Sequence, residues 1–376
     1  FDSTQPDFDW RNPEVPAMFE GVLRFWLDRG VDGFRLDTAN MYVHDAELRD
    51  NPPIEPGMRV NGVAAGNPYA MQQPIYNITR PECLAFHERL RALVDQYPAT
   101  ACVGEIAALL DMHAAMAAYT ETGKRLHMAY SFDFLTEEFS AAHVRAVAGT
   151  NADRLGSGWP GWAFSNHDVA RVVSRWGKEA EAEAAAPLLL ALLTSLRGTP
   201  CIYQGEELGL PEAVVPFELM QDPYGIRFWP EAKGRDGCRT PMPWSGALRH
   251  GGFSTVTPWL PVPDSHLLRA VSVQEVDLSS TLNRARRILS WRRDQAPLVK
   301  GGVRFHDAPG EIVAFSRERE AERLLCLFNL ASAPASFDAT GFPGLAALEG
   351  HGFAASLSGG RVALGGHDAF FGSYQP

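Results

Sequence analysis

Three acidic side chains end apolar, strand-like runs of this sequence. Asp37 closes the run VDGFRLD, Glu105 closes ACVGE, and Asp168 closes WAFSNHD. If these strands lie parallel, their C-terminal ends meet at one edge, so that the three carboxylates converge on one pocket. Glycoside chemistry needs such a set, because one carboxylate attacks as the nucleophile and a second, protonated carboxyl group assists the leaving group.

Asp37 follows an arginine, Arg35, by two positions on the same expected strand. A neighbouring cation keeps a carboxylate ionised, which suits a nucleophile. Glu105 follows Gly104 and an apolar run, where burial would raise its pKa, as a proton donor requires. The simpler readings are a helix cap for Asp37, a structural ion pair for Arg35 and an exposed loop acid for Glu105.

The elements that must position these acids alternate between strand and helix. We predict five strand-then-helix units in residues 1–296, an alternation that is typical of a (β/α)8 TIM barrel. The predicted strands end at residues 37, 105, 134, 168 and 204, and the predicted helices span about 16–29, 81–97, 111–122, 136–148, 179–197 and 277–294.

Five strands cannot close an eight-stranded barrel. Together with a start at Phe1 rather than Met, this count favours a chain that carries about strands 4–8 of a larger barrel. The N-terminal remainder of the enzyme, as a second chain or a further segment, would then supply three strands and part of the pocket. Residues 50–80 are rich in Pro, Gly and Asn, and we expect them to form a long loop that covers the site.

The pattern changes near residue 297. Short strands separated by turns are expected at 303–306, 311–316, 323–330, 335–338 and 361–364. About eighty residues of this kind indicate an all-β domain, and we predict a β-sandwich over 297–376. The chain is therefore an α/β protein in which part of a barrel precedes a C-terminal β domain.

Composition and charge limit the classes of partner and the compartment that we expect. A formal net charge of −11 argues against nucleic acid, which needs a basic face. We find no apolar run long enough to span a membrane. The five cysteines form no CxxC pair and suit a reducing compartment, so we expect a cytoplasmic protein without disulfides.

The motifs as a set resemble the α-amylase superfamily (glycoside hydrolase family 13), and within it the α-glucosidase and oligo-1,6-glucosidase branch. GFRLD at 33–37 is similar to the nucleophile region, VGE at 103–105 to the acid/base region, and FSNHD at 164–168 to the third-carboxylate region. RTPMPW at 239–244 resembles a loop of this branch. The family's first motif, its inserted domain and its calcium loop have no counterpart here.

The resemblance implies roles for the acids. Asp37 would be the nucleophile, Glu105 the general acid and then base, and Asp168 the stabiliser of the transition state. It also implies that four further residues bind substrate: Arg35, Thr38, His167 and Arg239. Without the resemblance, His167 and Arg239 would read as a structural histidine and a loop cation. Glu206 and Glu207 are expected to be structural.

The implied activity is that of a retaining α-glucosidase acting on terminal α-linked glucose in short substrates such as maltose, by hydrolysis or transfer. Thr38 suggests a preference for α-1,4 bonds. The alternatives are an oligo-1,6-glucosidase, a sucrose- or trehalose-active glucosyltransferase, and a non-catalytic amylase-like partner subunit. The resemblance implies no organic cofactor and leaves room for a structural calcium or magnesium ion in barrel segments outside this chain.

Overall fold

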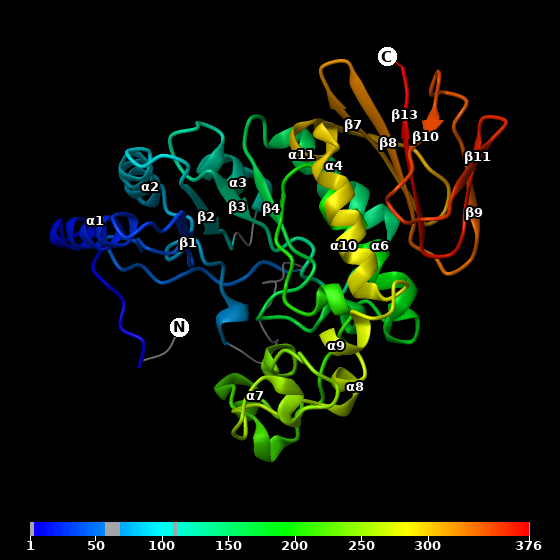
Figure 1. The fold of residues 1–376 in the computed structure, drawn as a ribbon. Coiled ribbons are helices and arrows are strands. Elements are labelled where there is room, and N and C mark those ends of the chain that lie inside the picture. The colour runs from blue at the N-terminus through cyan, green and yellow to red at the C-terminus, as the bar shows by residue number, and fades with distance from the viewer. Residues whose placement is uncertain (1–3, 57–67, 108–110, 376) are drawn as a thin grey trace. The chain divides into compact units, whose positions relative to one another are not determined.

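The computed structural model describes residues 4–56, 68–107 and 111–375 of the chain (Figure 1). The chain divides into two compact units, each of which is described separately below. The first unit comprises residues 1–133 and 153–162, and the second comprises residues 134–152 and 163–376. Of the helices in the described ranges, none is long and apolar enough to cross a membrane.

The first unit contains a parallel sheet in the order β1-β2-β3-β4. Its strands are β1 (Gly33–Leu36), β2 (Ala101–Glu105), β3 (Met128–Tyr130) and β4 (Pro160–Trp162), and its helices include α1 (Glu14–Leu27), α2 (Glu82–Val94) and α3 (Met112–Thr120). Buried residues of β2, α2 and α3 form one hydrophobic core. The parallel order brings the ends of β1 and β2 side by side, as the sequence predicts.

Two glycines in β1 and β2 leave no space for a side chain. A Cβ atom on Gly33 would lie 1.8 Å from the carbonyl oxygen of Ala101, its register partner. A Cβ atom on Gly104 would lie 2.2 Å from Cδ1 of Leu126. A side chain at Gly33 would push β1 away from β2, and a side chain at Gly104 would displace that of Leu126.

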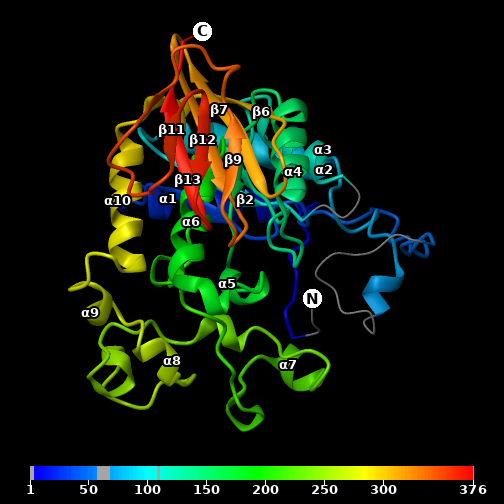
Figure 2. The ribbon, with the colours of Figure 1, turned by 90° about the vertical axis from the view of Figure 1, so that its right-hand side faces the viewer.

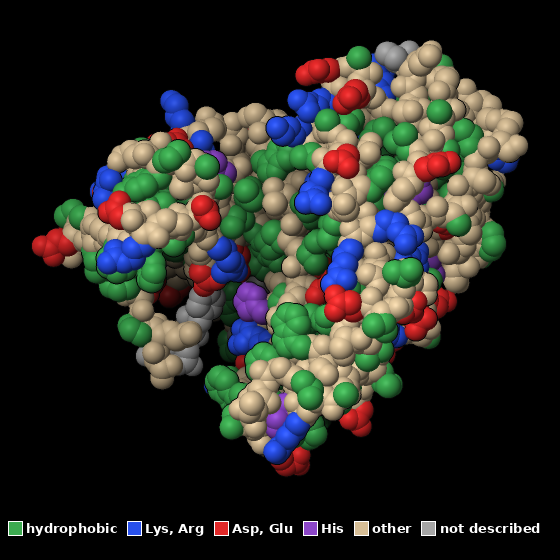
Figure 3. Space-filling view, viewed as in Figure 1, with side chains coloured by type: hydrophobic (Ala, Val, Ile, Leu, Met, Phe, Trp, Pro, Cys, Tyr) green, Lys and Arg blue, Asp and Glu red, His purple; other side chains and the backbone are tan. Residues whose placement is uncertain are grey.

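Helix α1 buries one side and leaves apolar residues on the other. Leu23 and Leu27 are buried. By contrast, hydrophobic side chains lie at the surface of this helix (Figure 3), and four of them are 45–48% exposed: Met18, Val22, Phe25 and Trp26.

The second unit begins with helical structure. Its helices are α4 (Ala141–Arg154, of which 141–152 belong to this unit), α5 (Val172–Arg175), α6 (Ala182–Ser195), α7 (Pro223–Arg227), α8 (Asp264–Leu267), α9 (Val271–Gln274), α10 (Thr281–Arg293) and α11 (Ala296–Lys300), and β5 is Thr199–Pro200. Helix α6 is rich in Ala and Leu, is buried along most of its length and packs against α10. Strands β1, β2, β3 and β5 lie within the predicted strands, whereas β4 overlaps its predicted strand only at Trp162.

The C-terminal strands form two antiparallel sheets (Figure 2). One has the order β10-β13-β8-β7-β6 and the other β11-β12-β9. Their bounds are β6 (Gly302–His306), β7 (Ile312–Arg319), β8 (Glu322–Asn329), β9 (Ala335–Asp338), β10 (Ala346–Ala347), β11 (Ser356–Ser358), β12 (Arg361–Leu364) and β13 (Asp368–Ser373). Apolar residues of both sheets share one core, which is the arrangement of a β-sandwich. The predicted all-β C-terminal part is confirmed.

A buried arginine holds the β domain to the helices of the same unit. The side chain of Arg317, on β7, is inaccessible to solvent. Its guanidinium donates hydrogen bonds to five backbone carbonyls at 2.6–3.0 Å, those of Ser195, Leu196, Leu298, Gly301 and Gly302. These carbonyls lie at the end of α6, in and just after α11, and at the start of β6.

The structure corrects one prediction that concerns the site. The strand predicted over 162–168 is wrong, because β4 spans Pro160–Trp162 and Asp168 lies six residues beyond its end. The physical reason is that side chains hold this segment out of the sheet: Arg175 donates to the carbonyl of Phe164, and Asn166 accepts from the backbone of Asp168. The predicted domain boundary after residue 296 stays a prediction.

Candidate active site

Arg35 joins the two acids at the ends of β1 and β2. Asp37 directly follows β1, and Glu105 is the last residue of β2. The guanidinium of Arg35 donates from Nη1 to a carboxylate oxygen of Asp37 and from Nη2 to Oε2 of Glu105 at 2.6 Å. Adjacent strand ends therefore place the predicted nucleophile and the predicted acid on one cation.

The turn after β1 adds two backbone contacts to Glu105. Thr38 has a positive φ of 45°, which is unfavourable for a β-branched residue. In this conformation its N–H donates to Oε2 of Glu105 at 3.3 Å. The next N–H, of Ala39, donates to the backbone carbonyl of Glu105 at 2.9 Å. Strain at Thr38 is thus coupled to the placement of the acid.

The surroundings of Glu105 favour its protonated form. Its side chain is 12% exposed, whereas that of Asp37 is 71% exposed. Burial, and then the hydrogen bond and charge of Asp37, raise the pKa of Glu105 to about 7, although Arg35 counteracts them. Glu105 can therefore carry a proton at neutral pH and release it when needed.

The guanidinium of Arg35 remains protonated. Burial acts to lower the pKa of Arg35, but hydrogen bonds and charges of Asp37 and Glu105 raise it overall. Arg35 therefore stays charged over the working pH range.

Two buried residues, Asn40 and His87, form hydrogen bonds that hold the turn after β1. The sequence analysis did not select either of them as a site residue. Asn40 is fully buried, and its amide donates to Oγ1 of Thr79 at 2.8 Å and to the carbonyl of Ala107 at 3.0 Å. His87 is equally buried and its Nε2 lies 2.7 Å from the carbonyl of Ala39. Burial lowers the pKa of His87 to about 4, so the neutral ring donates this bond. Asn40 could have been noticed as a polar residue three positions after Asp37, whereas nothing in the sequence marks His87.

In the second unit, Asp168 is the centre of a cluster of cations. Its N–H donates to Oδ1 of Asn166 at 2.8 Å, which orients the residue after the chain leaves β4. Its Oδ1 accepts from Nη2 of Arg239 at 3.0 Å and from Nη1 of Arg235 at 3.2 Å. Nε2 of His167 lies 3.4 Å from its Oδ2.

Arg235 and Arg239 each form a further interaction that holds the guanidinium in place. Nε of Arg239 donates to the carbonyl of His167 at 2.7 Å. Arg235 binds the buried carboxylate of Asp222 through Nε and Nη2, both at 2.9 Å. Sequence reasoning selected Arg239 and missed Arg235, although both stand in the segment RDGCR. The second arginine in this short segment is the sequence feature that could have drawn attention to Arg235.

The predicted site residues thus form two groups. The first unit brings together Arg35, Asp37, Thr38 and Glu105, and the second brings together His167, Asp168 and Arg239. The predicted covering loop, 50–80, lies partly outside the described residues; its described ends are joined by a β-bridge between Pro53 and Gln72. Within the described ranges, no group of three or more His, Cys, Asp or Glu side chains is arranged to hold a metal ion.

Comparison with known proteins identifies the family. Residues 1–301 match the alpha amylase catalytic domain. The chain belongs to the α-amylase family. The probable alpha-glucosidase of Rhizobium meliloti (strain 1021) is 47% identical over 374 residues, which are 99% of this chain and 68% of that relative. The oligo-1,6-glucosidase of Parageobacillus thermoglucosidasius is 29% identical over 363 residues, which are 88% of this chain and 62% of that relative.

Solved structures agree with this membership. The structure of an alpha-glucosyl transfer enzyme, XgtA, matches with a TM-score of 0.95 and 45% identity over 100% of this chain and 70% of the XgtA chain. Trehalose-6-phosphate hydrolase from Bacillus licheniformis matches with a TM-score of 0.84 at 24% identity, which shows a shared fold. The predicted family and fold class are confirmed, and the chain spans 62–71% of the length of these proteins.

Proposed function

We propose that the protein is a retaining α-glucosidase that hydrolyses or transfers terminal α-linked glucose from short substrates such as maltose. The observation that carries this proposal is the pair Asp37 and Glu105 on the single guanidinium of Arg35. The names of the probable alpha-glucosidase and of the alpha-glucosyl transfer enzyme among the relatives support it.

In the proposed reaction, Asp37 attacks the anomeric carbon of the terminal glucose. The bond to the leaving oxygen breaks as Glu105 donates its proton to that oxygen, which gives a covalent glucosyl-Asp37 intermediate. Glu105, now ionised, takes a proton from water or from an acceptor hydroxyl, which then displaces Asp37. Its pKa of about 7 suits both steps, because the group can donate and accept near neutral pH.

We assign sugar binding to the second group of residues. The Asp168 carboxylate accepts hydrogen bonds from sugar hydroxyls and stabilises the transition state, and His167 and Arg239 bind the same glucose. Arg235 and Arg239 fix the direction of the Asp168 carboxylate. Arg35 and Thr38 belong to the binding surface around the nucleophile.

Linkage preference is proposed from Thr38, which favours α-1,4 bonds. A preference for α-1,6 bonds is the second candidate, because several relatives are named oligo-1,6-glucosidases. A non-catalytic role as a partner subunit is disfavoured, since both acids and the cation between them are present. Transfer competes with hydrolysis for the same intermediate, and acceptor binding decides the ratio.

A substrate panel tests the proposal. Maltose, isomaltose, trehalose and sucrose are supplied in turn, and released glucose and transfer products are measured. The proposal predicts release of α-glucose with retention and the highest kcat/KM on maltose. No turnover of any α-glucoside, or release of β-glucose, would overturn it.

The remaining expectations belong to the same proposal. We propose that the reaction needs no organic cofactor, and that a structural calcium or magnesium ion, where one binds, is held by barrel segments that are not in this chain. The proposed partners are a small oligosaccharide or α-glucoside and the N-terminal remainder of the enzyme, and not nucleic acid or a membrane. We propose a cytoplasmic location.

A further inference from the structure

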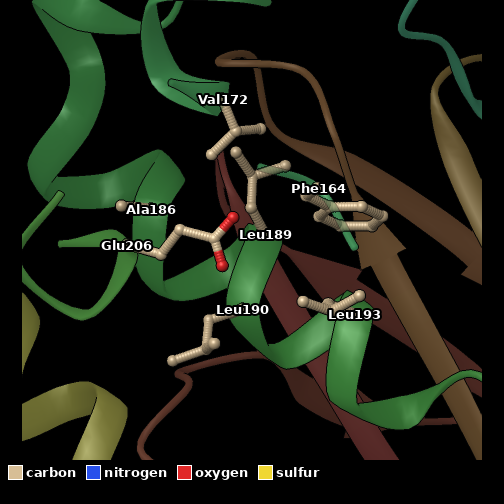
Figure 4. A pocket seen from close by; sticks show the side chains of 7 residues that line it. All are labelled: Phe164, Val172, Ala186, Leu189, Leu190, Leu193 and Glu206. Atoms are coloured by element: carbon tan, nitrogen blue, oxygen red, sulfur yellow. The ribbon is translucent and has the colours of Figure 1, made fainter. Parts of the chain in front are cut away.

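A small cavity in the second unit contains one carboxyl group among apolar side chains (Figure 4). The carboxyl group belongs to Glu206. Figure 4 shows it directed towards the hydrophobic residues that line the rest of the cavity, which are Phe164, Val172, Ala186, Leu189, Leu190 and Leu193. An acid in such a place needs an explanation, because an unpaired charge there is costly.

The two oxygens of Glu206 have different surroundings. Oε2 accepts a hydrogen bond from the N–H of Tyr203 at 3.2 Å, and the hydroxyl group of Ser165 lies close enough to act on the carboxyl group. Oε1 is buried and has no hydrogen-bond partner among the described residues. A water molecule in the cavity would need two to four polar partners, and the lining offers only this carboxyl group.

The charged groups near Glu206 do not neutralise an ionised form. The guanidinium of Arg175 is committed to backbone carbonyls, including those of Phe134, Thr136 and Phe164. The neighbouring Glu207 opposes a second negative charge. Burial is the dominant influence and raises the pKa of Glu206 to about 8. Burial among apolar side chains outweighs the hydrogen bonds and the charge of Arg175, which act to lower the pKa, so a neutral carboxylic acid is favoured at physiological pH.

Ser165 links Glu206 to the segment that carries the third carboxylate. Ser165 is buried, and its Oγ accepts a hydrogen bond from the N–H of Val172 at 2.8 Å. His167 and Asp168 lie between Ser165 and Val172 in the sequence. The chain of contacts from Tyr203 through Glu206 and Ser165 therefore fixes both ends of this segment.

We propose that Glu206 is a positioning residue which, as a neutral carboxylic acid, ties the turn Tyr203–Gly209 to Ser165 and thereby fixes the segment that carries Asp168. The proposal rests on the proposed function, because Asp168 acts on the sugar only there. Loss of the proton places an unpaired charge among leucines, so that the segment must rearrange to admit water or a counter-ion.

The first test is the pH dependence of kcat/KM for 4-nitrophenyl α-glucoside. Above pH 7 the enzyme loses the proton of Glu105, and above about pH 8 it loses that of Glu206 as well. We expect log(kcat/KM) to fall with a slope approaching about −2 per pH unit in the wild type and about −1 in Glu206→Gln, since each essential proton contributes one unit of slope.

Glu207→Gln is the matched control. Glu207 is the next residue, and its carboxylate accepts from the N–H of Gly205 at 2.8 Å without facing the cavity. Glu207→Gln should keep the wild-type slope, and Glu206→Gln should keep kcat/KM at pH 6 within about threefold, because glutamine is neutral and of the same shape. A wild-type slope in Glu206→Gln, or a folded Glu206→Gln that loses more than about tenfold at pH 6, would overturn the proposal.

A second measurement does not depend on activity. A group whose folded-state pKa is raised contributes stability that is complete below its unfolded value of 4.5 and is lost as the pH rises through about 8. The Tm of the wild type should therefore fall more steeply than that of Glu206→Gln between pH 5 and pH 9. Parallel Tm curves would refute the neutral acid even if the enzyme proves inactive on every α-glucoside, an outcome that would refute only the proposed function.

Discussion

Replacing Arg35 by glutamine should move the alkaline limit of activity to higher pH. Arg35 lies 2.6 Å from Oε2 of Glu105 and lowers the pKa of that acid against the effects of burial and of Asp37. Unit charges about 4 Å apart interact by about 4 kcal/mol at an effective dielectric constant of 20, or about three pKa units. Because the side chain of Arg35 is 40% exposed, solvent screening reduces the expected shift to about one or two units.

The alkaline limb of kcat/KM should therefore move from about pH 7 to about pH 8–9 in Arg35→Gln. At pH 6 we expect kcat/KM to fall by about 10- to 100-fold, since Asp37 and Glu105 lose the guanidinium that holds both of them in place. The assay is the pH profile of 4-nitrophenyl α-glucoside hydrolysis between pH 4 and pH 10.

Arg89→Gln serves as the control for this experiment. Arg89 also forms an ion pair, with Glu20 at 2.7 Å, but its side chain is 52% exposed. Exposed pairs contribute about 0–1 kcal/mol, so this variant should keep the wild-type profile. An alkaline limb in Arg35→Gln that stays near pH 7 or moves lower would refute the electrostatic reasoning.

Three further substitutions test how the structure supports the site. Gly104→Ala should lower the free energy of unfolding by about 1–3 kcal/mol in urea denaturation, because the new Cβ would lie 2.2 Å from Cδ1 of Leu126; unchanged stability would show that the Leu126 side chain can move aside without cost. Arg317→Met should cost at least about 3 kcal/mol in the same assay, because five backbone carbonyls lose a charged donor, and a smaller loss would mean that water replaces it. Thr38→Val should raise the ratio of isomaltose to maltose hydrolysis, whereas an unchanged ratio would remove Thr38 as the basis of linkage preference.

The positions of Asp37 and Glu105 could be predicted from the sequence because each depends only on a local strand pattern. Asp37 and Glu105 each needed only a strand end, and the register of β1 with β2 brings those ends together. Asp168 contacts His167 and Arg239, but it was assigned to the wrong element, because β4 ends at Trp162. Its position depends on side-chain bonds to backbone groups, such as those of Asn166 and Arg175, and no strand pattern contains that information.

Residues that act through distant contacts were not predictable in this way. His87 supports the turn after β1 from a helix 48 residues away in the sequence. Arg235 depends on Asp222, and Glu206 depends on Ser165. In each case the residue type is common on surfaces, and only the fold shows that the side chain is held next to the segment that it positions.

The central claim is that Asp37 forms a covalent bond to glucose, and trapping the intermediate tests it most directly. The enzyme is incubated with 5-fluoro-α-glucosyl fluoride, which slows breakdown of the intermediate, and the digested protein is analysed by mass spectrometry. We predict one fluoroglucosyl adduct, on the peptide that contains Asp37, and no adduct in Asp37→Ala. An adduct on another carboxylate, or an active enzyme that forms no adduct, would contradict the account.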